Sequence, residues 1–162
     1  MKINKLIQKN FYNFLFILLI FLLDQISKYF VLEYFNQSSN KTFVVNSFIS
    51  FNFLWNNGIA FGLFQFEDRL FYNIFTFLIL GVLIILFWLS SRREGIEKKS
   101  YLMILGGGLG NVFDRLMYGS VIDFIDLNYK NFHWFIFNVA DIFITLGIFT
   151  LIIIEIFRIK KQ

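Results

Sequence analysis

Asp123 and Asp141 are the residues of this chain best suited to acid–base chemistry, because neither has a basic partner close by in the sequence. Two carboxylates that are brought together cannot both ionise cheaply, so such a pair would share one proton over a wide pH range. The ionised member can then take a proton from water while the protonated member polarises a carbonyl group. This combination is sufficient for peptide hydrolysis without a metal or a covalent intermediate.

Competing hydrolytic mechanisms lack essential residues in this sequence. Cysteine is absent, which excludes disulfides, thiolate metal sites and a thiol nucleophile. The single histidine, His133, stands beside Trp134 and is interpreted as an interfacial side chain rather than as a catalyst or ligand. Ser27 lies one turn from Asp24 and has no convincing base, so it is assigned to packing or hydrogen bonding. We therefore expect neither a metal nor a cofactor.

The composition indicates that lipid, rather than water, surrounds the elements that position these residues. Hydrophobic residues make up 57% of the 162 residues and charged residues only 16%, and the apolar residues form long runs. The net charge of +4 comes from short basic clusters that flank these runs. Such clusters are typical of the cytoplasmic ends of membrane helices, so no binding of nucleic acid is expected.

Four runs reach or approach the roughly 20 apolar residues that a membrane-spanning helix requires. They predict a single membrane-embedded domain, residues 1–162, with spans at about 11–34, 70–89, 101–118 and 135–157. The third run is short, rich in glycine and ends in polar residues. The first run is not interpreted as a cleaved signal peptide, because no small-residue cleavage site follows it and it continues through Asp24 and Lys28.

The basic clusters also predict the orientation of the spans. They lie before the first span, between the second and third, and after the fourth, so both termini are expected to be cytoplasmic. The loops at about 35–69 and 119–134 then lie outside. Alternation of apolar and polar residues from Ile49 to Asn56 predicts a strand with one apolar face, and the apolar segment from Ile59 to Phe66 predicts a short interfacial helix. The expected fold is an all-α, four-span membrane protein with a small extracytoplasmic β-sheet.

Polar residues inside the spans share one depth, near the outer interface. Ionisable side chains in a membrane are costly unless they are paired or face water, and each is therefore a functional candidate. Spacings of three or four place them in pairs on single helical faces, and the glycines of the third span allow close helix packing. A structural role is favoured for Asp24 with Lys28 and for Asp114 with Arg115, whereas a functional role is favoured for Asp123 and Asp141. The paired residues and the glycines are Asp24 and Lys28, Asn111 and Asp114, Asn138 and Asp141, and Gly106, Gly107, Gly108 and Gly110.

Five motifs, in order along nearly the whole chain, resemble those of the lipoprotein signal peptidases, which are also called signal peptidase II and form aspartic peptidase family A8. One such motif would be weak evidence, but five in this order are specific. They run from Asp24 to Lys28, Asn56 to Gly62, Gly106 to Arg115, Val121 to Phe124 and Phe137 to Asp141.

The resemblance implies an intramembrane aspartic endopeptidase that removes signal peptides from diacylglyceryl-modified prolipoproteins, cutting just before the lipid-modified cysteine. It implies that Asp123 and Asp141 are the catalytic dyad, and that other motif residues bind substrate or support the fold. The substrate-binding set is Asn56, Gly58, Asn111, Arg115 and Asn138, and the structural set is Asp24, Lys28 and Asp114. It further implies a bacterial inner-membrane protein, expected to be a monomer among membrane lipids, with its active site near the outer leaflet and with globomycin as an inhibitor.

Three alternatives remain open from the sequence alone. Asp114 could be the second catalytic carboxylate, although the adjacent Arg115 should favour its ionised form and suit it to a structural ion pair. A small proton-coupled transporter would also contain buried carboxylates, but such proteins usually have inverted repeats or helices broken at the midplane. Here the polar residues gather at one interface, and no repeat is found. A non-catalytic anchoring subunit would leave the two outer carboxylates without a purpose. The first outer loop is also a candidate lid over the site.

Overall fold

The apolar runs form helices, as expected for segments that must satisfy their backbone hydrogen bonds without water. The computed structural model describes residues 2–38, 42–58, 69–130 and 132–160. Within these residues it contains four helices and four strands. The helices are α1 (Lys2–Gln37), α2 (Arg69–Ser91), α3 (Gly95–Tyr118) and α4 (Val139–Ile159), and the strands are β1 (Thr42–Val44), β2 (Ile49–Asn56), β3 (Val121–Tyr129) and β4 (Phe132–His133).

Three of the helices are long and apolar enough to cross a membrane. These segments are Gln8–Gln37 of α1, Arg69–Ser91 of α2 and Val139–Ile159 of α4. The 24 residues of α3 are long enough, but its glycines and polar residues make it too polar to meet this criterion. The predicted count of four spans is therefore not confirmed by length and composition, which identify three.

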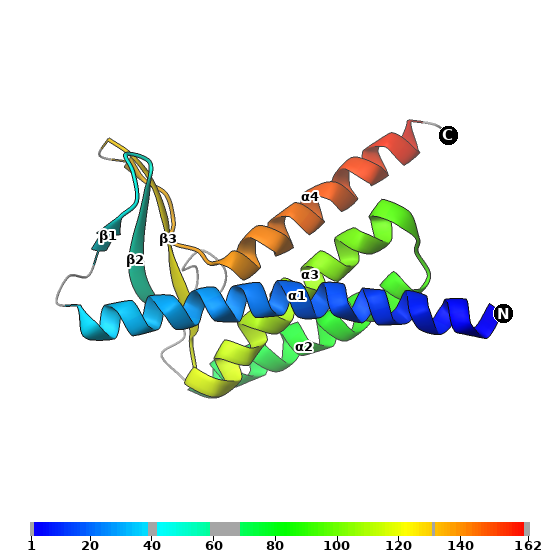
Figure 1. Ribbon diagram of the computed structural model, residues 1–162, viewed down its shortest axis with the longest axis horizontal. Helices are drawn as coiled ribbons and strands as arrows, with labels where there is room; N and C mark the ends of the chain where they lie inside the picture. The colour runs from blue at the N-terminus through cyan, green and yellow to red at the C-terminus, as the bar shows by residue number, and fades with distance from the viewer. Residues whose placement is uncertain (1, 39–41, 59–68, 131, 161–162) are drawn as a thin grey trace.

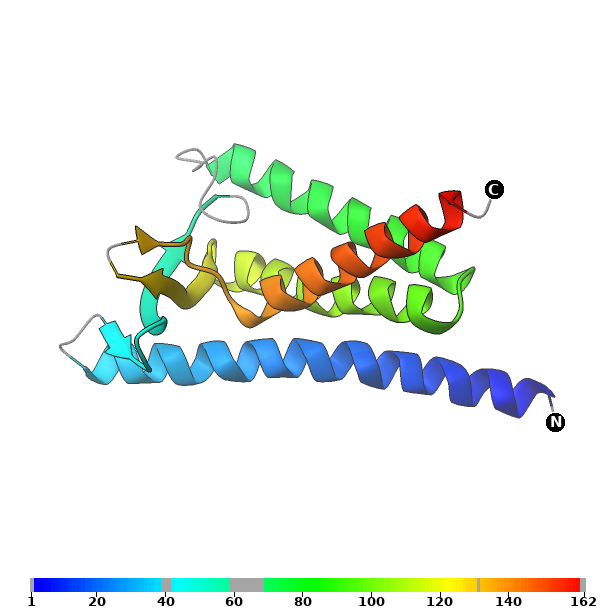
Figure 2. The same ribbon diagram turned by 90° about the horizontal axis from the view of Figure 1, so that it is seen from above.

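Helix α3 lies in the middle of the bundle, between α1 and α2 and beside α4 (Figures 1 and 2). Four of its glycines, Gly106, Gly107, Gly108 and Gly110, each meet a neighbouring element. A Cβ added to Gly106 would lie 2.8 Å from the Cβ of Ile20 on α1, and one added to Gly107 would lie 2.5 Å from the backbone oxygen of Ala140 on α4. The absence of side chains at these positions therefore allows the close approach predicted for this helix.

A four-stranded antiparallel sheet in the order β1-β2-β3-β4 stands at one end of the bundle (Figure 1). Strand β2 confirms the strand predicted at Ile49 to Asn56. Its central partner β3 comes from the second outer loop and was not predicted as a strand. The start of α1 and the end of α4 both lie at the opposite end of the bundle (Figures 1 and 2).

The alternating sequence predicted that β2 would have one apolar face and one polar face, but burial in the structure does not follow this division. The polar residues Ser50 and Asn56 are buried, whereas Trp55 keeps 40% of its surface exposed. Both buried residues donate hydrogen bonds to carboxylates of β3, which explains why polar side chains occupy this face. The interfacial helix predicted from Ile59 to Phe66 lies outside the described residues.

Replacing Gly107 by alanine should destabilise the fold, because the new methyl group meets the backbone of α4, which cannot rotate away. Overpacking of this kind costs about 1–3 kcal/mol. Thermal unfolding of the purified protein in detergent should therefore show a lower midpoint for Gly107→Ala. The control is Gly81→Ala on α2, where an added Cβ meets nothing within 4 Å. Equal unfolding midpoints for Gly107→Ala and Gly81→Ala would contradict the close packing of α3 on α4.

Candidate active site

Asp123 lies on β3, where antiparallel pairing with β2 brings it beside Asn56. Leu54 pairs with Asp123 and Asn56 pairs with Val121, so Asn56 and Asp123 are diagonal neighbours on one face of the sheet. The Nδ2 group of Asn56 donates a hydrogen bond of 2.7 Å to Oδ2 of Asp123. A register shift between Phe51 and Leu54 precedes this part of the pairing.

Asp141 lies in the first turn of α4, and Asn138 is the N-cap of that helix. The backbone N–H of Asp141 donates to Oδ1 of Asn138 at 3.0 Å, and the backbone N–H of Asn138 donates to Oδ2 of Asp141 at 3.2 Å. This reciprocal pair is a capping box. The prediction that this helix begins near residue 135 is therefore wrong, since α4 begins at Val139. The three-residue spacing of Asn138 and Asp141 reflects the capping box and not two positions on one helical face.

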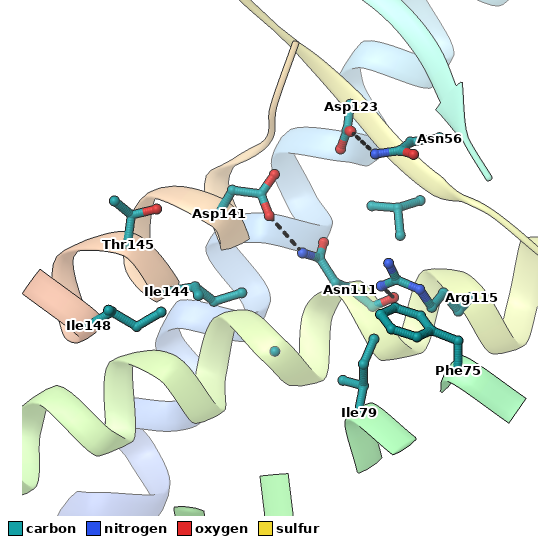
Figure 3. A pocket seen from close by; sticks show the side chains of 12 residues that line it. Asn56, Phe75, Ile79, Asn111, Arg115, Asp123, Asp141, Ile144, Thr145 and Ile148 are labelled. Atoms are coloured by element: carbon teal, nitrogen blue, oxygen red, sulfur yellow. Dashed lines mark hydrogen bonds between the residues drawn. The ribbon is translucent and has the colours of Figure 1, made fainter. Parts of the chain in front are cut away.

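Two asparagine side chains, Asn111 and Asn138, join the two aspartates, and Figure 3 shows the hydrogen bond from Asn111 to Asp141. Nδ2 of Asn138 donates to Oδ1 of Asp123 at 2.6 Å and to Oδ1 of Asn111 at 3.1 Å. Nδ2 of Asn111 donates in turn to Oδ1 of Asp141 at 2.9 Å. Within the described part of the chain, the two carboxylates are thus linked through amides rather than by a direct hydrogen bond.

Both aspartates line one cavity of about 310 Å³. Its polar end also contains three of the predicted substrate-binding residues, and the described part of its remaining wall is mostly apolar. The polar residues are Asn56, Asn111, Arg115, Asp123 and Asp141, and the other described lining residues are Phe75, Ile79, Gly108, Val121, Ile144, Thr145 and Ile148. The arrangement offers two carboxylates to a largely apolar ligand.

The environment of Asp123 favours retention of a proton. Burial, and then the nearby charge of Asp141, raise the pKa of Asp123 to about 7, whereas hydrogen bonds from Asn56 and Asn138 act in the opposite direction. Because the two carboxylates interact, an apparent pKa measured near 7 belongs to the pair. The pair can therefore hold one shared proton at neutral pH, as the sequence argument requires.

A buried ammonium group lies behind the two aspartates. Nζ of Lys28 is 2.7 Å from Oδ2 of Asp24 and 2.8 Å from Oδ2 of Asp114, and it donates a 3.0 Å hydrogen bond to Oδ1 of Asn111. The side chains of Lys28, Asp24 and Asp114 are at most 2% exposed. The predicted pairing of Asp24 with Lys28 is thus present in the structure.

The two carboxylates of this group also hold the backbone beside each candidate catalytic residue. Oδ1 of Asp24 accepts a hydrogen bond of 2.9 Å from the backbone N–H of Ala140, next to Asp141. Oδ2 of Asp114 accepts one of 3.2 Å from the backbone N–H of Ile122, next to Asp123. The structural residues therefore fix the two segments that carry the aspartates.

The expected ion pair between Asp114 and Arg115 is not formed. Asp114 pairs with Lys28, whereas the guanidinium group of Arg115 donates to the backbone oxygens of Asn111 at 3.3 Å and Gly58 at 3.2 Å. Gly58 in turn donates its N–H to Oδ1 of Asn56 at 2.8 Å. Gly58 and Asn138 thus contact residues of the cavity wall without being among its described lining residues.

Gln25 is a site residue to which the sequence assigned no role, although it lies inside the first motif. Its Nε2 group is within hydrogen-bonding distance of Oδ1 of Asp114 at 3.0 Å, Oδ2 of Asp24 at 3.1 Å and the backbone oxygen of Gly110 at 3.3 Å. The amide thus links α1 to α3 beside the ion pairs. Its position next to Asp24 was the available signal.

His133 lies on β4, and its side chain is 62% exposed. Its Nδ1 is 2.8 Å from Oδ2 of the buried Asp126, which also accepts a hydrogen bond of 2.7 Å from Asn52. Neither Asp126 nor His133 is among the described residues of the cavity wall. The interpretation of His133 as an interfacial side chain rather than a catalyst stays a prediction.

Comparison with known proteins identifies a family over most of the chain. Residues 16–158 match the sequence profile described as Signal peptidase (SPase) II. The lipoprotein signal peptidase of Pelagibacter ubique is 40% identical over 160 residues, covering 98% of this chain and 96% of that protein. The lipoprotein signal peptidase of Blochmanniella pennsylvanica is 41% identical over 149 residues, covering 90% and 88% respectively.

Two solved structures of bacterial membrane enzymes, both determined by the in meso method, have a similar fold. The structure at 2.3 Å resolution matches with a TM-score of 0.76 and 27% identity, covering 93% of this chain and 91% of that chain. The structure at 1.9 Å resolution matches with a TM-score of 0.67 and 28% identity, covering 89% and 92%. The similarity therefore extends over most of the chain.

Replacing Lys28 by methionine should strongly destabilise the protein, because Asp24 and Asp114 would remain buried without their shared cation. Removing one partner of a buried ion pair costs about 3–5 kcal/mol. The control is Lys9→Met, which removes an exposed lysine that pairs with the exposed Glu94, and which should have little effect. Denaturant titration of the two purified variants measures the difference. If Lys28→Met had the same free energy of unfolding as the wild-type protein, the central role of this ammonium group would be contradicted.

Proposed function

Because the chain belongs to the signal peptidase II family, we propose that Asp123 and Asp141 are the catalytic dyad with which it removes signal peptides from prolipoproteins. The observation that carries this proposal is that Asp123 of β3 and Asp141 of α4 line one cavity. Their carboxylates are linked by the side chains of Asn111 and Asn138. The protein is accordingly an aspartic peptidase of the signal peptidase II type.

The proposed reaction uses one proton shared by the dyad. The ionised carboxylate takes a proton from a water molecule as the water oxygen attacks the scissile carbonyl carbon. The protonated carboxyl group donates a hydrogen bond to the carbonyl oxygen and stabilises the charge that develops there. Collapse of the tetrahedral intermediate breaks the C–N bond, and the leaving nitrogen receives a proton from the dyad.

Polar residues around the dyad are suited to holding the peptide backbone of the substrate. Arg115 and Asn111 lie on α3 at the cavity wall, and Asn56 reaches it from β2. Arg115 is fixed by its hydrogen bonds to Asn111 and Gly58, so it can present a charged donor in one orientation. Asn138 has a positioning role, since it caps α4 and binds Asp123.

The cavity wall supports a lipid-modified substrate. Phe75 and Ile79 of α2 and Ile144 and Ile148 of α4 line the part of the cavity that continues from the dyad. Apolar walls of this kind suit the side chains of a signal peptide and the acyl chains of a diacylglyceryl group. We therefore assign cleavage to the bond just before the lipid-modified cysteine.

We further propose that α3 is the fourth span. Its 24 residues are about 36 Å long, which is sufficient for the hydrocarbon core of a bilayer. Helix α3 does not need an apolar surface on every side, because α1, α2 and α4 surround it and its polar face can point into the bundle. On the basis of the basic clusters, we propose that both termini lie in the cytoplasm of a bacterial cell and that the dyad lies near the outer leaflet of its inner membrane. We also predict that the protein is a monomer and that globomycin inhibits it.

The geometry disfavours Asp114 as the second catalytic carboxylate. Asp114 binds Lys28 and the backbone of Ile122, and it is not among the described residues of the cavity wall. Its oxygens are already engaged in holding the fold. Asp114 therefore keeps the structural role that the family resemblance implies.

Asp123→Asn and Asp141→Asn should each abolish cleavage while leaving a folded, membrane-inserted protein, because the amide keeps the size of the side chain but cannot exchange a proton. The assay is release of the signal fragment from a purified lipid-modified prolipoprotein. The matched control is Asp126→Asn, which changes a buried carboxylate on the same strand away from the cavity and should retain turnover. An active Asp123→Asn protein together with an inactive but folded Asp114→Asn protein would overturn the assignment.

The cleavage rate should fall on the alkaline side with an apparent pKa near 7, as the dyad loses its last proton. In Asn56→Ala this alkaline limb should move to higher pH, because the lost hydrogen bond stabilises ionised Asp123. Rate profiles against pH measure both values. The control is Asn52→Ala, which removes an equivalent amide contact to Asp126 and should leave the limb in place. A limb that moves to lower pH in Asn56→Ala would refute the proton-sharing role of Asp123.

A further inference from the structure

A second cavity, of about 490 Å³, lies where α2 begins and α3 ends. Its described wall is polar and differs from the wall of the dyad cavity, with which it shares only Arg115. Six of the wall residues have polar side-chain groups: three come from the first turns of α2, two from the last turn of α3, and one from the segment just before Gly58. These six are Arg69, Tyr72, Asn73, Arg115, Tyr118 and Asn57.

Two buried polar atoms of residues in this wall lack hydrogen-bond partners. Tyr72 is 5% exposed and Arg115 is 8% exposed, yet the hydroxyl of Tyr72 and Nε of Arg115 have no partner in the part of the chain that the structure describes. A buried donor without a partner is costly, and native structures contain few of them. Because Nε–H of arginine can only donate, the missing group at this position must be an acceptor.

The charge of the wall indicates what kind of acceptor this is. Arg69 and Arg115 each contribute a permanent positive charge, and the described lining residues include no aspartate or glutamate. Asn73 lies four residues after Arg69 on α2 and adds amide donors on the same side of the helix. Several donors around two guanidinium groups match the oxygens of a phosphate ester.

The surroundings of the cavity indicate that the phosphate belongs to a lipid. Leu116 and Met117, which also line the cavity, are each 62% exposed on a helix that packs in the bundle of apolar helices. Such side chains at the rim would contact acyl chains while the arginines bind the headgroup. We propose that this cavity binds the phosphate headgroup of an anionic membrane phospholipid.

Binding would also affect the dyad cavity through the shared arginine. The Nη atoms of Arg115 donate to Asn111 and Gly58, and Nε is the nitrogen of the same planar group that has no partner among the described residues. A phosphate bound at Nε would hold the guanidinium from its other edge. The lipid site and the peptide site would then be occupied together, without competition for the same atoms.

The test measures lipid binding directly and does not depend on peptide cleavage. The delipidated protein, purified in detergent, is titrated with phosphatidylglycerol or with phosphatidylcholine, and bound lipid is followed by native mass spectrometry. Phosphatidylglycerol should bind more tightly, because phosphatidylcholine carries its own cation. Tyr72→Phe and Arg69→Gln should each weaken phosphatidylglycerol binding by about tenfold, as expected for loss of a hydrogen bond to a charged group.

Matched controls separate this site from general attraction to the protein surface. Tyr29→Phe changes an exposed tyrosine of α1, and Arg92→Gln removes a charge at the other end of α2, so both should bind phosphatidylglycerol like the wild type. Equal binding by Tyr72→Phe, Arg69→Gln and their controls would overturn the proposal. Glycerol phosphate is the third ligand, and if it bound as tightly as the lipid, the cavity would be a site for soluble phosphate esters and the lipid assignment would be wrong.

Discussion

The burial of one lysine charge organises the whole site. The ammonium group of Lys28 is enclosed in the bundle, and it is stable there only because Asp24 and Asp114 supply opposite charges at 2.7 and 2.8 Å. Those two carboxylates accept further hydrogen bonds from the backbone next to Asp141 and Asp123. A charge that must be neutralised inside the membrane protein thus ties α1, α3, β3 and α4 together at the point where the dyad is formed.

Much of this arrangement was predictable from local sequence. The four-residue spacing of Asp24 and Lys28 predicts an ion pair along a helix, and the structure confirms it. The glycines of α3 predict close packing, which is also confirmed. The family motifs indicate which polar residues belong to one site, and five of the predicted site residues line one cavity. These features depend on helical periodicity or on residue type alone.

The parts that could not be predicted depend on contacts between distant segments. Consecutive helical residues point about 100° apart, so Asp114 and Arg115, although adjacent, have different partners. The pairing of β3 with β2 joins two loops that are far apart in sequence, and it is this pairing that places Asp123 beside Asn56. The start of α4 could have been located more accurately, because asparagine three residues before aspartate is close to the capping-box pattern.

The orientation of the two linking amides follows from the same constraints. Lys28 and the backbone N–H of Asp141 can only donate hydrogen bonds, so Oδ1 of Asn111 must face the ammonium group and Oδ1 of Asn138 must face the N–H. The Nδ2 groups are then directed at Asp141 and Asp123 respectively. Each carboxylate consequently meets amide donors, which stabilise its ionised form. Sharing of a proton must therefore come from burial and from repulsion between the two carboxylates, and these are the two causes that raise the pKa of Asp123.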